Sequence, residues 1–271
     1  MKELSLSFRA SDFESFGDFT DHIKQMVLTA SNSLDVTYSD VRPVWSDYIF
    51  DIPDPVINDK RIRKNYNSRT ETFHMKIMPP HIHNCHHAWQ VWTAGNWRTS
   101  GLLTIDEKHN LTNIIGTTLN FTHGPYSRSR KEPDFCMIPS RHHLPSIAVE
   151  SGWSENYNQL RADMDLWLVG GITIVQLVFI LNWTKRLQHV SGTVEVWSLH
   201  PNGIPVCRQT ETIFPRPRNN QTQVINITHR QLFSGHCFPN CRPDGVLPYR
   251  VDDLRTAAEN ALSYMDLKPA Q

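Results

Sequence analysis

The chain has 271 residues, of which 39% are hydrophobic, and it contains eight Trp and twelve Phe. This length and composition are sufficient for the core of one large domain or two small ones. Basic and acidic residues number 27 each and the isoelectric point is about 7.2, which argues against a globally basic nucleic-acid-binding protein but leaves room for local basic patches.

Membrane and secretion signals are not evident. The longest apolar run, residues 172–181, is too short to span a bilayer, and the first residues lack the apolar segment of a signal peptide. Five cysteines, an odd number without regular spacing, favour reduced thiols. We therefore expect an intracellular protein, cytoplasmic or nuclear, without a membrane partner. No heptad or exposed apolar stripe indicates an oligomeric state.

Residues 1–66 are predicted to form a helix and an irregular arm. Apolar side chains recur at helical spacing from Phe13 to Leu28, in a helix that is expected to begin at Ser11. Residues 32–60 carry three prolines and little periodicity, so an irregular linker or wrapping arm is expected there.

Residues 67–200 are predicted to form an α/β core. The segment 70–78 alternates between apolar and polar residues, which predicts a half-buried strand ended by two prolines. A helix is expected over 81–97, where the Trp residues indicate core packing. Its four His and one Cys between positions 81 and 87 raise the alternative of a zinc site, but the sequence offers no nearby third ligand for His83 and His87. A further strand is expected over 113–121.

The most informative stretch runs from residue 129 to residue 181. It predicts a hairpin of strands 135–138 and 146–149, a helix capped by Ser154 and ended by Gly170 and Gly171, and a buried strand over 172–181.

Two acidic residues lie at the ends of the hairpin strands. Asp134 precedes the first strand and Glu150 follows the second, so antiparallel pairing brings both carboxylates to one point. Converging carboxylates suit a hard divalent cation such as Mg²⁺, which can activate water and stabilise charge on a phosphodiester. The alternative is that each acid decorates the end of its strand.

These motifs resemble the core of the PD-(D/E)XK, or restriction-endonuclease-like, nuclease superfamily. The resemblance rests on Pro133-Asp134, the hairpin, the run E-S-G-W-S-E at 150–155 and the L-R-A-D helix at 160–163. More narrowly, these runs and K-E-P-D at 131–134 are similar to a group of fungal proteins with that fold. The similarity covers about residues 67–199. It implies a central mixed sheet flanked by helices.

The resemblance also implies a division of roles. Asp134 and Glu150 would bind the metal, with the carbonyl of Ser151 as a further ligand. The superfamily lysine that orients the attacking water is replaced by Gly152. In some branches this lysine moves to the following helix, where the only cation here is Arg161.

Arginine stays protonated, so Arg161 could bind phosphate but could not act as a base. Gln159 is a candidate for orienting substrate or water. Asn84 stands where the first core helix of the superfamily often carries an acid, and it is a weaker ligand. A basic loop with Arg128, Arg130 and Lys131 precedes Asp134, either to contact a phosphate backbone or to balance nearby acids.

Residues 201–271 are predicted to extend the sheet and to end in a helix. Asn202-Gly203 indicates a hairpin between strands 192–199 and 206–214, a short strand is expected at 224–227, and residues 251–265 form an amphipathic pattern. A polar segment between them contains a possible zinc site, with the four candidate ligands His229, His236, Cys237 and Cys241.

Three functions are therefore compared. The leading one is a Mg²⁺-dependent nuclease. The second keeps the nuclease fold without catalysis and binds nucleic acid or protein. The third is a zinc-stabilised binding protein.

Overall fold

A computed structural model describes residues 4–59, 61–153, 156–218, 222–236 and 242–271. The chain has a mixed α/β fold, as predicted, and divides into two compact units. Unit 1 comprises Met1–Pro80 and Gly116–Pro133, and unit 2 comprises His81–Ile115 and Asp134–Gln271. The boundary between Pro133 and Asp134 therefore lies inside the stretch that carries the motifs. None of the helices among the described residues is long and apolar enough to cross a membrane.

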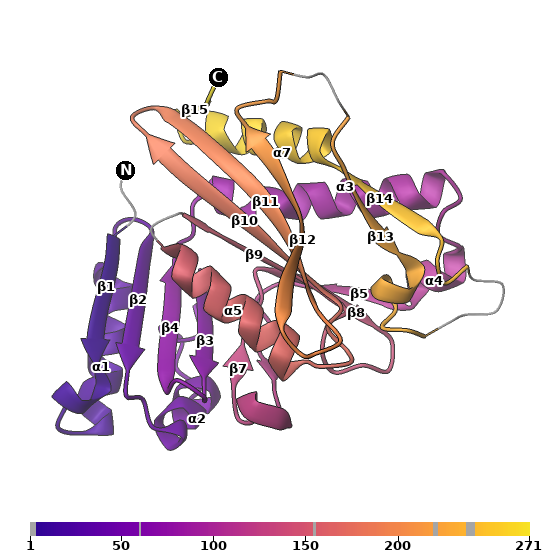
Figure 1. The fold of residues 1–271 in the computed structure, drawn as a ribbon. Coiled ribbons are helices and arrows are strands. Elements are labelled where there is room, and N and C mark those ends of the chain that lie inside the picture. The colour runs from indigo at the N-terminus through magenta and orange to yellow at the C-terminus, as the bar shows by residue number, and fades with distance from the viewer. Residues whose placement is uncertain (1–3, 60, 154–155, 219–221, 237–241) are drawn as a thin grey trace. The chain divides into compact units, whose positions relative to one another are not determined.

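Unit 1 is a six-stranded sheet with the order β1-β2-β4-β3-β7-β6 (Figure 1). Its strands are β1 (Leu4–Arg9), β2 (Leu34–Ser39), β3 (Ile62–Asn67), β4 (Thr72–Ile77), β6 (Leu119–Asn120) and β7 (Arg130–Lys131), and its helices are α1 (Phe16–Thr29), α2 (Pro43–Asp51) and the short turns η1 (Ala10–Asp12) and η3 (Gly124–Tyr126). Phe19 and Ile23 of α1 are buried in one core with Tyr38 and Phe73 of the sheet.

Two predictions for the N-terminal region are wrong. The segment 32–60 is not an irregular arm, because it forms β2 and α2; proline 43 opens α2, at the position where its missing N–H costs nothing. The first helix begins at Phe16 rather than near Ser11, since the Ser15 side chain accepts a hydrogen bond from the Asp18 N–H and Asp18 returns the bond.

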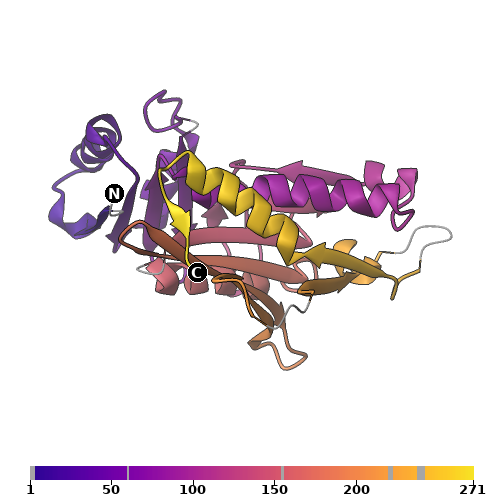
Figure 2. The same ribbon diagram turned by 90° about the horizontal axis from the view of Figure 1, so that it is seen from above.

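Unit 2 contains the larger sheet, in the order β12-β11-β10-β9-β8-β5, with β15 beside β11 and a separate β13–β14 pair. Its strands are β5 (Leu111–Ile114), β8 (Phe135–Pro139), β9 (Ile147–Trp153), β10 (Leu177–Arg186), β11 (His189–Leu199), β12 (Pro205–Phe214), β13 (Val224–Thr228), β14 (Val246–Arg250) and β15 (Lys268–Pro269). Its helices are η2 (His81–Asn84), α3 (Cys85–Thr99), α4 (Ile105–His109), α5 (Tyr157–Gly170), α6 (His229–Leu232) and α7 (Val251–Ser263). Helices α3 and α7 cover one face of the sheet and α5 covers the other (Figures 1 and 2).

The predicted hairpin is confirmed. β8 and β9 are antiparallel, with Phe135 opposite Val149, and α5 then leads to β10, which runs parallel to β9. The strand expected over 172–181 lies at 177–186, because Gly171 ends α5 and a turn follows: the N–H groups of Ile174 and Val175 donate to the Gly171 carbonyl. Ser154, the predicted cap, lies outside the described residues.

The remaining elements agree in part. The β11–β12 hairpin, β13 and the C-terminal helix α7 form as predicted. The single strand expected over 113–121 is divided into β5 and β6, since Gly116 between them has a φ of 63°, outside the extended region. β14 was not predicted.

Candidate functional site

Asp134 and Glu150 lie at the same end of the β8–β9 hairpin. Phe135 pairs with Val149, Asp134 is the residue just before β8, and Glu150 is the next residue of β9. Both are buried, with exposed fractions of 2% and 0%. The Ser151 N–H, one residue after Glu150, donates to Asp134 Oδ2, so the fold brings the two acidic residues near the same part of the backbone.

Glu150 is held from the α5 side of the sheet. The indole Nε1 of Trp167, on α5, donates to Glu150 Oε1 over 2.7 Å, and both side chains are fully buried. Two residues further along β9, a Cβ on Gly152 would lie 3.4 Å from the side chain of Leu160. Leu160 therefore occupies the space beside Gly152 into which a side chain at that position would extend.

Asp134 is held by a backbone amide and an imidazole. Its Oδ2 accepts from the Ser151 N–H at 2.9 Å and lies 3.2 Å from His83 Nε2. The backbone carbonyl of Asp134 accepts from His87 Nε2 at 3.0 Å. Asn84 Oδ1 lies 3.0 Å from His83 Nδ1, so Asn84 stands one contact away from the carboxylate.

Sequence reasoning did not connect Trp167, His83 and His87 with the two acids. The proximity of His83 and His87 could have been suspected from the crowding of His residues between positions 81 and 87. Trp167 left no such signal, because a Trp on an apolar helix face is expected in any core. Within this group His86 is completely buried, and burial lowers its pKa well below 6.5, so its ring is neutral near neutral pH.

Two further predicted residues belong to α5. Gln159 Nε2 donates to Asp163 Oδ1 at 2.8 Å, and Asp163 is buried. The guanidinium carbon of Arg161 lies 3.7 Å from the ring centroid of Trp197 on β11. Neither Gln159 nor Arg161 is among the hydrogen-bond partners described above for the two acids.

The predicted basic residues lie in unit 1. Arg128 Nη2 is 2.7 Å from Asp47 Oδ2, and Arg130 Nη1 is 2.6 Å from Asp51 Oδ1. These guanidinium groups are thus paired with carboxylates of α2. Lys131 is buried, with an exposed fraction of 2%.

The second predicted metal site is only partly described. Cys237 and Cys241 lie outside the described residues. His229 is buried, and its Nδ1 lies 2.9 Å from Glu107 Oε1, so only Nε2 could bind an ion. His236 is described, but no group of three or more His, Cys, Asp or Glu within the described ranges is arranged to hold a metal.

The donor set of Asp134 and Glu150 suits a hard cation that keeps several waters. Mg²⁺ is typically bound through one or two carboxylates, with water completing its octahedron. The contacts of Trp167 to Glu150 and of Ser151 and His83 to Asp134 orient the two carboxylates. In their chemistry, two oriented carboxylates fit Mg²⁺.

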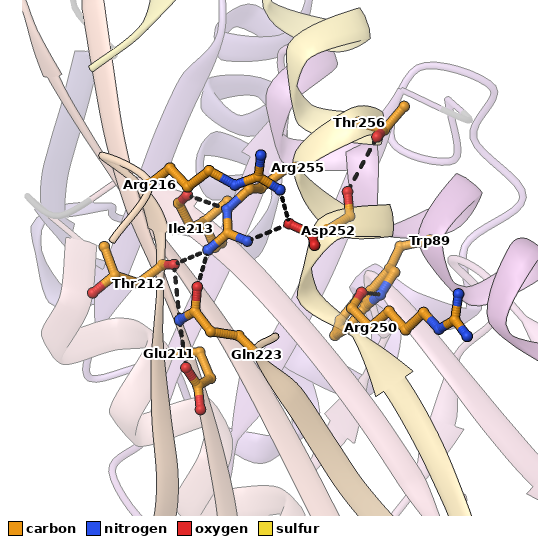
Figure 3. A network of polar contacts seen from close by, with 10 residues as sticks. All are labelled: Trp89, Glu211, Thr212, Ile213, Arg216, Gln223, Arg250, Asp252, Arg255 and Thr256. Carbon is orange, nitrogen blue, oxygen red and sulfur yellow. Dashed lines mark hydrogen bonds and ion pairs between the residues drawn. The ribbon is translucent and has the colours of Figure 1, made fainter. Parts of the chain in front are cut away.

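A second polar network of unit 2 surrounds Arg255 on α7 (Figure 3). Its guanidinium donates to the carbonyl oxygens of Ile213 and Thr212 at 2.8 and 2.7 Å, to Gln223 Oε1, and to Asp252 Oδ1 at 2.6 Å. Arg255 is buried, and this network connects α7 to β12 and to the segment before β13.

No protein-family model, curated protein or solved structure matches this chain.

Proposed function

We propose that the chain is a metal-dependent nuclease of the PD-(D/E)XK type, which hydrolyses phosphodiester bonds with Mg²⁺ held by Asp134 and Glu150. The observation that carries this proposal is the presence of two buried carboxylates at the same end of the β8–β9 hairpin, one just before β8 and one within β9. Each is oriented by a fixed N–H donor, as the ligands of a hard divalent cation commonly are.

The order of elements supports the proposal. An antiparallel hairpin (β8–β9), a crossover helix (α5) and a parallel strand (β10) follow one another in a mixed sheet with helices on both faces. This is the order that the resemblance implies, and it supports the proposal that Asp134 and Glu150 are the metal ligands.

In the proposed reaction, bound Mg²⁺ would supply an activated water and stabilise charge on the phosphate. The chain's own groups set the geometry. Trp167 and the Ser151 N–H fix the orientation of the two carboxylates, and the carbonyl of Ser151 is the proposed third ligand. Arg161 is the proposed phosphate contact within unit 2. The contacts expected from the sequence for Lys131, Arg128 and Arg130 of unit 1 stay predictions, and Arg128 and Arg130 already pair with α2.

Gln159 and Asn84 have supporting positions in this scheme. Gln159 is proposed to orient substrate or water, and its side chain is already fixed by Asp163. Asn84 contacts His83, and it would act on Asp134 through that ring. A purified protein that contained tightly held zinc would instead support a role for His229, His236, Cys237 and Cys241.

A second function is favoured by one observation. The Leu160 side chain packs against Gly152, where the superfamily places its lysine. Loss of a group that positions the nucleophile commonly costs orders of magnitude in rate. The alternative is thus a nuclease-fold protein that binds nucleic acid or protein without cutting it.

Cleavage assays separate these two functions. Labelled single-stranded DNA, duplex DNA and RNA are incubated with native protein, Asp134→Asn and Glu150→Gln, with Mg²⁺ or with EDTA. We expect Mg²⁺-dependent cleavage that falls at least about 100-fold in each variant, since a metal ion contributes several kcal/mol to transition-state stabilisation. Binding without cleavage of any substrate would support the inactive module. Cleavage that persists in both variants would exclude this site as the catalytic centre.

A further inference from the structure

A polar cluster lies on the same face of the sheet as Glu150. It consists of Tyr157 and Arg161, one turn apart at the start of α5, and of Glu195 and Trp197 on β11. The Tyr157 hydroxyl lies 3.0 Å from each oxygen of Glu195, and Trp197 Nε1 donates to Oε2 at 2.7 Å. Glu195 is therefore fixed by two neutral donors.

Arg161 is held by stacking on Trp197 and by a hydrogen bond with the Tyr157 hydroxyl rather than by an ion pair. Its guanidinium carbon lies 3.7 Å from the Trp197 ring centroid, and within the described ranges no carboxylate forms an ion pair with it. Stacking occupies a face of the planar guanidinium and leaves N–H donors at its edge. Arg161 is half-buried, so this edge is accessible to a ligand. The ligand that matches such a fork is a carboxylate or a phosphate.

The strand register gives the position of this cluster relative to the two acids. Glu150 pairs with Ile180 on β10, and Ile180 pairs with Glu195 on β11. Directly paired residues point to the same face, so Glu150 and Glu195 lie in one row, two strands apart. Adjacent strands are separated by 4.7–4.9 Å, which puts the two carboxylate positions about 10 Å apart.

We infer that the Arg161–Trp197 stack clamps a backbone phosphate of the substrate at a distance from the cleaved bond, and that the substrate is therefore a nucleic-acid strand rather than a small phosphodiester. The inference rests on the proposed function. Arg161 belongs to the cluster around Glu195, whose position on the sheet lies two strands, or about 10 Å, from that of Glu150. A strand that crosses both positions would therefore present a different phosphate to each of them. Trp197 is a positioning residue, since it orients Arg161 without contacting the substrate.

Binding in EDTA tests the clamp without requiring catalysis. The fluorescence anisotropy of a fluorescein-labelled single-stranded oligonucleotide is measured over a range of salt concentrations. The variants are Arg161→Ala, Arg161→Lys and Trp197→Phe, and the matched control is Arg186→Ala, an exposed arginine at the far end of β10. Thermal melting establishes that each variant is folded.

We expect Arg161→Ala to weaken binding about 10-fold and to reduce the slope of log Kd against log salt by about 0.7, the value for one lost contact to a single strand. Arg161→Lys keeps the slope and binds more weakly than native protein, because lysine loses the planar fork. Trp197→Phe also keeps the slope. Arg186→Ala changes neither quantity. Equal effects of Arg161→Ala and Arg186→Ala, or an unchanged slope in Arg161→Ala, would overturn the inference.

Tyr157→Phe tests whether Arg161 binds a ligand or only helps to hold α5 against β11. It removes the hydroxyl contacts to Glu195 and to Arg161 but keeps the Trp197 ring on which Arg161 stacks. Native-like binding of Tyr157→Phe supports the clamp, and a loss equal to that of Arg161→Ala contradicts it.

Cleavage data separate this inference from the nuclease proposal. If Arg161→Ala lowers cleavage of the oligonucleotide but not of bis(p-nitrophenyl) phosphate, both stand. If no substrate is cleaved but Arg161→Ala still reduces the slope of log Kd against log salt, the clamp stands and the nuclease proposal fails. If cleavage needs Asp134 and Glu150 while Arg161→Ala binds normally, the clamp fails alone.

Discussion

The Arg255 network and the Asp134–Glu150 pair are two buried charged regions of unit 2 that are constructed differently. Arg255 is surrounded by acceptors: two backbone carbonyls, a side-chain amide and the opposite charge of Asp252 (Figure 3). Asp134 and Glu150 instead bring two acidic side chains to the same end of one hairpin, where an amide, an indole and an imidazole contact them.

This difference indicates two roles. A buried charge that is matched by fixed partners stabilises the packing of the elements that it joins, and its removal leaves those partners unsatisfied. Two acidic side chains at one end of a hairpin would repel each other when both are charged, and a bound divalent cation would offset that cost. We therefore propose structural stability as the role of the Arg255 network and metal binding as the role of the Asp134–Glu150 pair.

The largest expected effect comes from breaking the Arg255 network. Arg255→Met should lower the free energy of unfolding by about 3–5 kcal/mol, because two buried carbonyl oxygens lose their donor. Urea denaturation measures this. Arg216→Met is the control, since its side chain is 66% exposed and its pairing with Asp252 should contribute less than about 1 kcal/mol. Equal effects of the two substitutions would contradict the structural role of Arg255.

Removing the indole donor from Glu150 should affect the metal site specifically. We expect Trp167→Phe to weaken Mg²⁺ binding about 10- to 100-fold, the usual range for a group that orients a metal ligand. Trp89→Phe is the control. It removes a similar volume from the core and breaks a bond to the Arg250 carbonyl instead, at 2.9 Å. Titration calorimetry of both variants would reject the positioning role of Trp167 if their Mg²⁺ affinities were the same.

The buried His86 ring should make the free energy of unfolding depend on pH. Burial lowers the pKa of His86 in the folded chain, whereas the unfolded ring titrates near 6.5. Below pH 6.5 the unfolded chain therefore binds a proton that the folded chain does not. The free energy of unfolding should fall on acidification, by up to about 1.4 kcal/mol per pH unit, until the folded pKa is reached.

Urea denaturation between pH 7.5 and 5.5 measures that slope. His86→Gln should have a smaller slope than native protein, and His189→Gln, at an exposed position, should match native protein. A His86→Gln slope identical to the native one would show that His86 is protonated in the folded chain.

The smallest expected effect is at Gly152. A Cβ there would lie 3.4 Å from Leu160, an ordinary contact, so Gly152→Ala should change stability by less than about 1 kcal/mol. Gly192→Ala offers the contrast, because its Cβ would lie 2.4 Å from the Trp183 ring and should cost more than about 2 kcal/mol. Thermal melting compares the two variants. A loss of stability in Gly152→Ala as large as that in Gly192→Ala would mean that α5 lies closer to β9 than the structure indicates.

The sequence predicts those parts of the fold that depend on local pattern. The β8–β9 hairpin, the β11–β12 hairpin around Asn202-Gly203 and the amphipathic helix α7 all follow from periodicity and turn residues. β2 and α2 were not predicted, because three prolines outweighed a short alternation.

The candidate site is predictable to the same extent. The presence of Asp134 and Glu150 at the same end of the hairpin follows from the hairpin alone. The contacts of Trp167 and His83 join segments 17 and 51 positions away from those acids, and no local pattern encodes such pairs. The pairing of Arg128 with Asp47 likewise depends on how α2 packs within unit 1.

Magnesium binding tests the central claim most directly. Titration calorimetry is performed on native protein and on Glu150→Gln, which keeps an acceptor for the Trp167 N–H and removes the charge. We predict that native protein binds one Mg²⁺ and that Glu150→Gln, still folded, does not. Absence of binding to native protein at millimolar Mg²⁺, or equal binding by both proteins, would contradict the assignment of Asp134 and Glu150 as a metal site.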